Sequence, residues 1–168
     1  RRSGGDGWTV RLAGGDTLDA AQVWSTAPLP ALARTVSPAP PPEALAAAGR
    51  LRHRAMILLY VVLDRPRWTE FDAHYFPGPE VVAARVSEPR NYRDDPAQPW
   101  DVTVLCAEIA CWEGDHLWRA SDTDLAARLA AELSAAGLPA PAPVAVESRR
   151  LPRVYPVYAP GFAADLAA

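Results

Sequence analysis

The densest group of polar side chains in the sequence lies between Arg85 and Arg93. This stretch combines three guanidinium groups with a carboxylate, an amide and a phenol. The planar guanidinium of arginine can bind a carboxylate or a phosphate through paired hydrogen bonds. The stretch is therefore a candidate binding loop, weakly favouring an anionic molecule, and the alternative is a solvated loop. Its candidate substrate-binding residues are Arg85, Ser87, Glu88, Asn91 and Tyr92.

A second candidate is the segment Leu151–Tyr158, which carries two prolines and two tyrosines. The prolines disfavour helix and keep the chain extended. Tyr155 and Tyr158 could line a pocket from such a segment. The alternative is an edge strand whose aromatic side chains only pack.

Other kinds of site lack the residues they need. His53, His74 and His116 are far apart in sequence, and none has a second ligand at a spacing typical of metal sites. Ser25 and Ser87 lack the Gly-x-Ser-x-Gly turn of a hydrolase nucleophile. The glycines do not form the Gly-x-Gly-x-x-Gly fingerprint of a dinucleotide site. We therefore predict no metal site and no catalytic residue within this chain.

Composition indicates a globular, cytoplasmic protein. The 168 residues suit a single domain, 49% of them are hydrophobic, and the net charge of −3 argues against nucleic-acid binding. All 17 basic residues are arginine and there are 18 prolines, as expected from a GC-rich bacterial genome, which weakens arginine clusters as functional signals. Cys106 and Cys111 are too few for a disulfide framework and are expected to be reduced. Five residues apart, they would point to opposite faces of a regular strand. No apolar run is long enough to cross a membrane.

The elements that must position these residues are arranged around an apolar run from Ala55 to Leu63. Both of its alternating sets of side chains are apolar, which predicts a central strand covered on both faces. The competing interpretation is a buried helix, and the β-branched residues with Asp64-Arg65-Pro66 at the end favour a strand. One face can pack on Leu125, Leu129 and Leu133, which recur every four residues and form the apolar stripe of a helix expected at 122–136. The other face, with Met56 and Tyr60, is the candidate floor of a substrate cavity.

The remaining pattern predicts short elements on either side of this strand. Strands are expected at 8–12, 17–26, 81–86, 101–110 and 144–150. Helices are expected at 29–36, at 43–48 with Gly49 ending it, and at 122–136 with Ser121 as its N-cap. The connections are too short for repeated parallel crossovers. The fold class is therefore predicted as α+β, a mostly antiparallel sheet of about five to seven strands with helices mainly on one face.

Four segments, taken in order, resemble a known family: residues 19–30 (Asp-Ala-Ala-Gln-Val-Trp-Ser-Thr-Ala-Pro-Leu-Pro), 51–63, 85–89 (Arg-Val-Ser-Glu-Pro) and 150–158 (Arg-Leu-Pro-Arg-Val-Tyr-Pro-Val-Tyr). The chain resembles the substrate-binding half of FAD-dependent oxidoreductases of the amine oxidase and protoporphyrinogen oxidase type. UDP-galactopyranose mutase is related to this group in fold.

The resemblance implies a division of labour. Residues 1–28 would link to an FAD-binding domain that is absent here, residues 150–168 would lead back to it, and Thr26, Ala27 and Pro28 would contact FAD only in the parent protein. The chain begins without methionine and lacks the family's glycine-rich FAD loop. We therefore expect a fragment that holds no cofactor alone and is not catalytic alone, in a parent that is an FAD-dependent oxidoreductase.

The resemblance also implies the partners. They are a small-molecule substrate, the missing FAD-binding domain and a possible second copy bound through exposed interdomain surface. The alternative function is a stand-alone α+β ligand-binding or protein-interaction module without flavin, and a redox-inactive relative is a third. The sequence does not identify the substrate.

Overall fold

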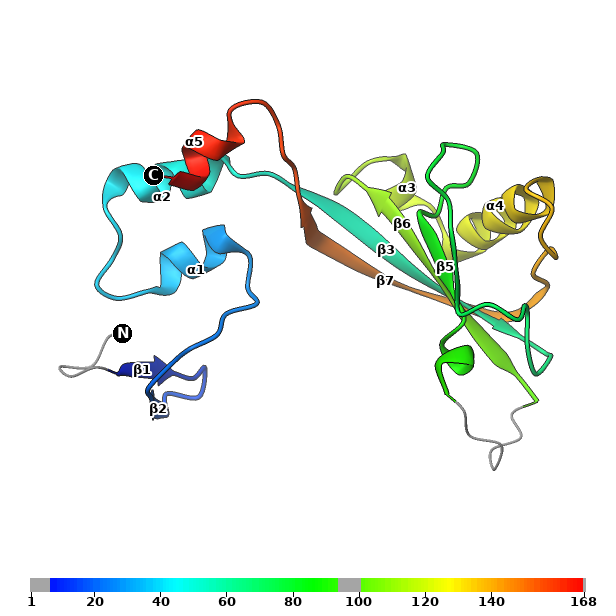
Figure 1. Ribbon diagram of the computed structural model, residues 1–168, viewed down its shortest axis with the longest axis horizontal. Helices are drawn as coiled ribbons and strands as arrows, with labels where there is room; N and C mark the ends of the chain where they lie inside the picture. Colours follow the sequence, from blue (N-terminus) through cyan, green and yellow to red (C-terminus); the bar gives the residue numbers. More distant parts are fainter. Residues whose placement is uncertain (1–6, 94–100, 168) are drawn as a thin grey trace. The chain divides into compact units, whose positions relative to one another are not determined.

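The computed structural model describes residues 7–93 and 101–167 of the chain. These residues form two compact units. Unit 1 comprises residues 1–52 and 156–168, and unit 2 comprises His53–Tyr155. Figure 1 labels the elements of both. Of the two segments expected to link to another domain, residues 1–28 belong to unit 1, and residues 150–168 are divided between unit 2 (150–155) and unit 1 (156–168).

Unit 1 begins with a β-hairpin of two short strands, β1 (Trp8–Arg11) and β2 (Thr17–Ala20). The strands are antiparallel, and the register pairs Trp8 with Ala20 and Arg11 with Thr17. The second strand was predicted to continue to Thr26, and this is wrong. Because Trp8 at the start of β1 already pairs with Ala20, the residues after Ala20 have no partner in β1.

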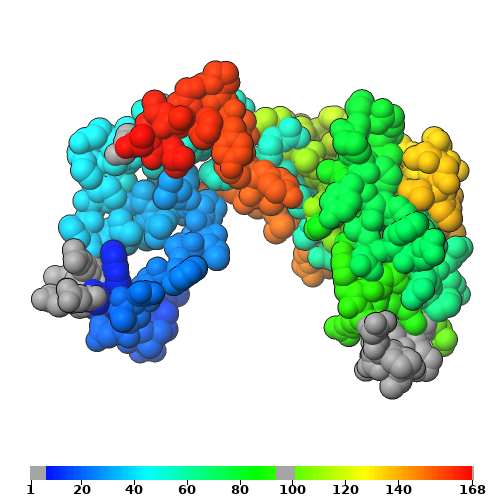
Figure 2. Space-filling view, in the orientation of Figure 1, coloured from blue at the N-terminus to red at the C-terminus, as the bar shows by residue number. Residues whose placement is uncertain are grey.

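Three helices complete unit 1: α1 (Leu29–Thr35), α2 (Pro42–Arg50) and α5 (Phe162–Ala167). In Figures 1 and 2 the hairpin, coloured dark blue, lies at the opposite end of unit 1 from α2 and α5. An ion pair of 2.6 Å between Arg50 and Asp165 joins α2 to α5. The sequence predicted α2 to end at Gly49, but the helix includes Gly49 and Leu51 is the C-cap. Gly49 does not adopt the positive φ that would make it a helix stop.

Unit 2 contains a five-stranded sheet in the order β4-β5-β6-β3-β7. Its long central pair, β3 and β6, is antiparallel and in register from Ala55–Cys111 to Leu63–Thr103. The apolar run at 55–63 is therefore an interior strand, as predicted. The strand bounds are β3 His53–Leu63, β4 Ala73–Tyr75, β5 Arg85–Ser87, β6 Thr103–Cys111 and β7 Pro143–Pro156.

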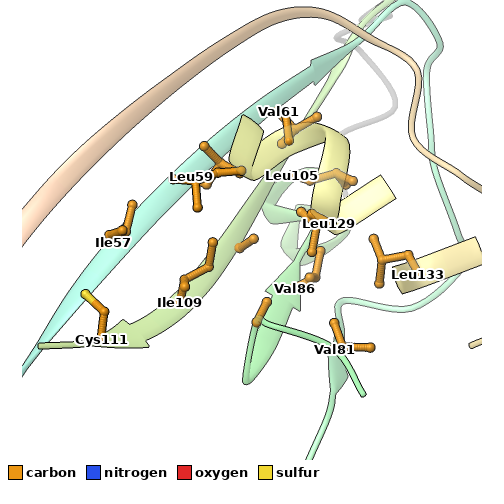
Figure 3. Packing of buried hydrophobic residues seen from close by; sticks show 14 of the residues in the cluster. Ile57, Leu59, Val61, Val81, Val86, Leu105, Ile109, Cys111, Leu129 and Leu133 are labelled. Atoms are coloured by element: carbon orange, nitrogen blue, oxygen red, sulfur yellow. The ribbon is translucent and has the colours of Figure 1, made fainter. Parts of the chain in front are cut away.

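The hydrophobic core of unit 2 lies between this sheet and helix α4 (Asp122–Ala135). Alternating side chains of β3 and β6, including Ile57, Leu59 and Ile109, are fully buried and point to the helix (Figure 3). Leu129 and Leu133 of α4 meet them, and Leu125 completes the stripe. Residues four apart lie on one face of a helix, so the leucine spacing predicted this contact correctly.

Hydrogen bonds at the start of α4 link the helix to β7. The Ser121 hydroxyl caps the helix by accepting from the Asp124 amide at 3.0 Å. Asp122 accepts from the amide and hydroxyl of Ser148 at 2.9 and 2.6 Å. Arg150 donates to the carbonyl of Trp118 in the short helix α3 (His116–Arg119), which the sequence reading missed. These contacts place Ser148 and Arg150 on the α4 side of the sheet.

The strand predicted over 81–86 is shorter than expected. Val81 and Ala83 are buried, but only Arg85–Ser87 pair as β5. The Val82 amide donates to the carboxylate of Glu132 on α4 at 2.5 Å. A side chain of the helix thus takes the hydrogen bond that a neighbouring strand would have accepted.

The described residues confirm the predicted fold class, α+β with antiparallel pairing. Within unit 2 the helices contact one face of the five-stranded sheet. The other face is the candidate ligand-binding face. No helix within residues 7–93 and 101–167 is long and apolar enough to cross a membrane.

Candidate ligand-binding face

We define the open face as the side of the five-stranded sheet that points away from α4. Successive side chains of a strand point to opposite faces, so the residues that alternate with the core set lie there. The register places Leu58 opposite Glu108, Tyr60 opposite Cys106, and Val62 opposite Val104. The open-face side chains of the three central strands are Met56, Leu58, Tyr60, Val62, Val104, Cys106, Glu108, Ala110, Arg85 and Ser87.

The middle of the open face is apolar and only half-buried. Leu58, Tyr60 and Val62 on β3 are partly exposed, whereas the alternating Leu59 and Val61 on the other side are fully buried. Met56, nearer the start of β3, is buried although it points to the same side. An apolar surface with few polar groups at defined positions is the usual character of a small-molecule site.

On the three central strands, this face carries the ion pair between Arg85 of β5 and Glu108 of β6, and Glu147 and Arg149 of β7 form a more exposed pair on the same side. The Nε of Arg85 donates to Glu108 Oε1 at 3.0 Å, and Nη2 donates to the same oxygen. The glutamate side chain is 13% exposed and the arginine side chain 37%. Hydrogen bonds to Glu108 and then to Tyr75 raise the pKa of the Arg85 guanidinium. The guanidinium predicted to capture an anion is thus already neutralised by its own chain.

Cys106 and Ser87 lie next to this pair on neighbouring strands. The Ser87 hydroxyl donates to the Cys106 carbonyl at 3.4 Å, so it supports the sheet rather than facing a ligand. Burial, and next the charge of Glu108, raise the pKa of the Cys106 thiol. Cys106 and the fully buried Cys111 are both free thiols and lie on opposite faces, as the strand alternation predicted.

Glu88 was predicted as a substrate-binding residue, and the structure places it in the interior with 1% exposure. Its Oε1 accepts from the Trp68 amide at 2.8 Å and from the Thr103 hydroxyl at 2.7 Å. Its Oε2 accepts from the Thr69 amide at 3.1 Å and from the Asn91 side chain at 3.3 Å. All these donors come from the chain itself. We refer to Glu88 with these donors as the Glu88 clamp.

Asn91 and Tyr92 lie on the 3₁₀ helix η1 (Pro89–Tyr92), beside the clamp. The Asn91 amide also donates to the carbonyls of Thr69 and Phe71 at 3.0 and 2.9 Å. Tyr92 is 57% exposed. The structure therefore gives Asn91 hydrogen bonds that hold the loop in place.

Tyr155 of β7 lies on the open-face side. Because Ser148 and Arg150 point to α4, alternation carries Leu151 and Tyr155 to the opposite side. Tyr158 belongs to unit 1, is 71% exposed and stacks with Phe162 at 4.9 Å between ring centroids. Thr26, Ala27 and Pro28 also belong to unit 1 and form an exposed connection before α1.

The structure thus brings together Met56, Tyr60, Arg85 and Ser87 from the predicted site, with Tyr155 on the adjacent strand. Sequence reasoning missed Glu108, Leu58 and Cys106. The alternation of residues 104–110 indicates which side chains share a face of the strand. Only the register shows which of them lie beside β3 and β5.

A separate cavity of about 630 Å³ lies at the edge of unit 2. It is bordered by the turn at Pro77 and Gly78 and by the last residues of α4. Its lining includes the phenol of Tyr75 and the carboxylates of Glu80 and Glu132, and Glu132 is already bonded to Val82 and Arg128. The cavity lies beyond the central strands that define the open face.

A metal or flavin site needs particular groups of side chains or backbone amides. Among residues 7–93 and 101–167 no group of three His, Cys, Asp or Glu side chains could hold a metal ion. A flavin dinucleotide needs backbone amides gathered around its phosphates, usually at a glycine-rich turn before a helix. The left-handed glycines described in unit 1 are Gly15, in the hairpin turn, and Gly161, before the six-residue α5.

Several solved structures share the α+β fold of this chain. The chain superimposes on reduced UDP-galactopyranose mutase with a TM-score of 0.66 and 18% identity, covering 95% of this chain and 34% of that one. A putative protoporphyrinogen oxidase from Exiguobacterium sp. 255-15 gives a TM-score of 0.55, 19% identity, and 99% and 36% coverage. Putrescine oxidase bound to putrescine gives a TM-score of 0.56 and 22% identity, covering 90% of this chain and 34% of that one. These likenesses concern the fold, and the chain spans about a third of the length of each protein.

The family follows from the sequence match. The family model described as flavin-containing amine oxidoreductase matches residues 1–163. The chain therefore belongs to the flavin-containing amine oxidoreductase family, and the predicted resemblance is confirmed. A comparison with curated proteins found no significant match.

Proposed function

We propose that this chain is the substrate-binding portion of a flavin-dependent oxidoreductase and that the open face is its substrate wall. The observation that carries the proposal is the half-exposed apolar centre of the open face at Leu58, Tyr60 and Val62. A fold that needed only stability would bury these side chains, because each apolar side chain removed from water contributes about 1.5–3 kcal/mol. Family membership supports the flavin chemistry.

In this proposal the residues of the chain bind and orient the substrate. The apolar side chains exclude water from it, and the Arg85–Glu108 pair and Tyr155 supply polar contacts. Met56 backs the face from its buried position. Bound FAD would supply the hydride acceptor, held mainly by other parts of the parent protein. Thr26, Ala27 and Pro28 would contribute backbone contacts to it.

The partners follow from the same proposal. The parent chain supplies an FAD-binding domain, and the 168-residue chain alone is inactive. Unit 1 has exposed apolar side chains, with Trp24 at 90% exposure and Tyr158 at 71%, which could meet that domain or a second copy. The cytoplasmic location stays a prediction. The organisation as one substrate-binding domain also stays a proposal.

The test compares the full-length protein with the 168-residue chain. We expect full-length protein to retain FAD through gel filtration and the isolated chain to retain none when mixed with equimolar FAD. Stoichiometric FAD binding by the isolated chain would refute the claim that it lacks the cofactor site. A full-length protein that never binds flavin would instead favour a ligand-binding or interaction module.

A pair of variants tests the open face in the full-length protein. Leu58→Trp fills the centre of the face and is expected to slow anaerobic flavin reduction by substrate at least about ten-fold while flavin content is unchanged. Ala127→Trp adds the same bulk on the exposed side of α4 and serves as the control. If both variants reduce flavin at the wild-type rate, the open face is not the substrate wall.

A further inference from the structure

The Arg85–Glu108 pair has an asymmetry that bears on ligand selectivity. Both arginine nitrogens, Nε and Nη2, donate to one oxygen of the carboxylate, Oε1. Among the described residues no other side chain donates a hydrogen bond to Glu108, and its Oε2 is accessible rather than buried. The second oxygen is therefore an available acceptor at the edge of the apolar centre, directly opposite Leu58.

Arg85, unlike Glu108, already forms hydrogen bonds to two neighbouring side chains. Two of its guanidinium nitrogens donate to Glu108. Its Cζ lies 6.0 Å from the Tyr75 ring centroid, and it also forms a hydrogen bond with Tyr75. A ligand anion arriving here would have to compete with Glu108 for the guanidinium and would lie close to a like charge. Such a like-charge approach on a poorly hydrated surface is unfavourable.

We propose that Glu108 is the polar recognition group of the open face, and that Arg85 is a positioning residue that holds it. The ligand group recognised is a hydrogen-bond donor, and carboxylates are rejected. This inference rests on the proposed function, because it assumes that the open face binds a ligand. It reverses the expectation from sequence that the arginines of 85–93 select an anion.

Three probes of one shape separate donor capacity from charge: 3-phenylpropanamide, methyl 3-phenylpropanoate and 3-phenylpropanoate. The amide carries N–H donors, the ester is neutral without a donor, and the carboxylate is anionic. Their affinities for the full-length flavin-loaded protein are measured by calorimetry. We expect the amide to bind about ten-fold more tightly than the ester, as one hydrogen bond to a charged acceptor allows, and the carboxylate to bind most weakly.

Substitutions at the pair should change selectivity in opposite ways. Glu108→Gln frees the guanidinium, so we expect the carboxylate to gain at least about ten-fold and to become the preferred probe. Arg85→Gln removes the cation, so the carboxylate stays weak and the amide loses its advantage over the ester. Arg128→Gln alters an exposed ion pair with Glu132 on α4, on the other side of the sheet, and is expected to leave all three affinities unchanged.

The outcomes separate this inference from the proposed function. If wild type prefers the carboxylate and Arg85→Gln abolishes the preference, Arg85 is the receptor and the inference is wrong. If all three probes bind equally and Leu58→Trp weakens them all, the face binds ligands but Glu108 does not select them. If no probe binds, or Leu58→Trp leaves every affinity unchanged, the proposed ligand face itself fails. Melting temperatures near wild type confirm that each variant is folded.

Discussion

The Glu88 clamp offers the sharpest test of whether a predicted binding residue is structural. Glu88→Ala removes an acceptor from two backbone amides, a hydroxyl and a side-chain amide. The bonds from Trp68 and Thr103 are buried, so water cannot readily replace the lost acceptor. Glu88→Gln keeps the shape but replaces one oxygen with an NH₂ group, which faces other donors.

The expected losses follow from these contacts. A hydrogen bond to a charged group contributes about 1.5–3 kcal/mol, and an unsatisfied buried donor costs a similar amount. Counting only the two buried bonds, Glu88→Ala should lower the free energy of unfolding by about 3–6 kcal/mol. Glu88→Gln retains one pair of bonds and should lose about half of that. A domain is stable by only about 5–15 kcal/mol, so both losses are large.

The assay is urea unfolding followed by tryptophan fluorescence, with the probe affinities measured on the folded variants. Glu147→Gln, on the exposed strand β7, is the control and should change stability by less than about 0.5 kcal/mol. Thr103→Val combined with Glu88→Gln should cost less than the sum of the two, because the residues share one bond. If Glu88→Ala unfolds at the wild-type urea concentration but binds the probes poorly, Glu88 is a ligand residue and the structural assignment is wrong.

Three further predictions follow from burial and titration. Leu129→Ala, in the core beneath the sheet, should cost about 2–5 kcal/mol in urea unfolding, and a loss below about 1 kcal/mol would contradict the packing. Burial lowers the pKa of His74 despite the opposing charge of Glu88, so the neutral ring is favoured in the fold. The unfolded chain therefore binds a proton that the folded chain does not, and stability should fall as the pH drops below the ordinary value of 6.5. His74→Gln should remove this part of the pH dependence, and an unchanged slope would contradict it. Native labelling with iodoacetamide, read by mass spectrometry, should modify Cys106 slowly, because burial raises its pKa, and Cys111 only after unfolding. Labelling of Cys111 at the rate of Cys106 would show that the strand faces are misassigned.

The sequence predicted the elements whose pattern depends on local periodicity. Ala55–Leu63 was recognised as an interior strand because both of its alternating sets are apolar. The stripe of Leu125, Leu129 and Leu133 correctly predicted α4 and its contact with the sheet. Helix caps were less reliable, since Gly49 adopts ordinary helical geometry and α2 continues past it.

The elements that failed depend on partners elsewhere in the chain. Residues 21–26 look like a strand, but β1 is already paired as far as Ala20. Residues 81–84 look like a strand as well, but Glu132 takes the amide of Val82. Whether an extended segment becomes a strand depends on which groups accept its backbone hydrogen bonds. The local sequence does not show which groups the fold brings to it.

The candidate site shows the same division. The sequence by itself determined the family, the α+β class and the apolar strand that carries Met56 and Tyr60. Only the tertiary structure decided that Arg85 faces Glu108, and that Glu88 points into the interior. The physical reason is that adjacent residues of a strand point to opposite faces, so the roles of neighbours such as Arg85 and Val86 are set by the partners that pairing brings to each side.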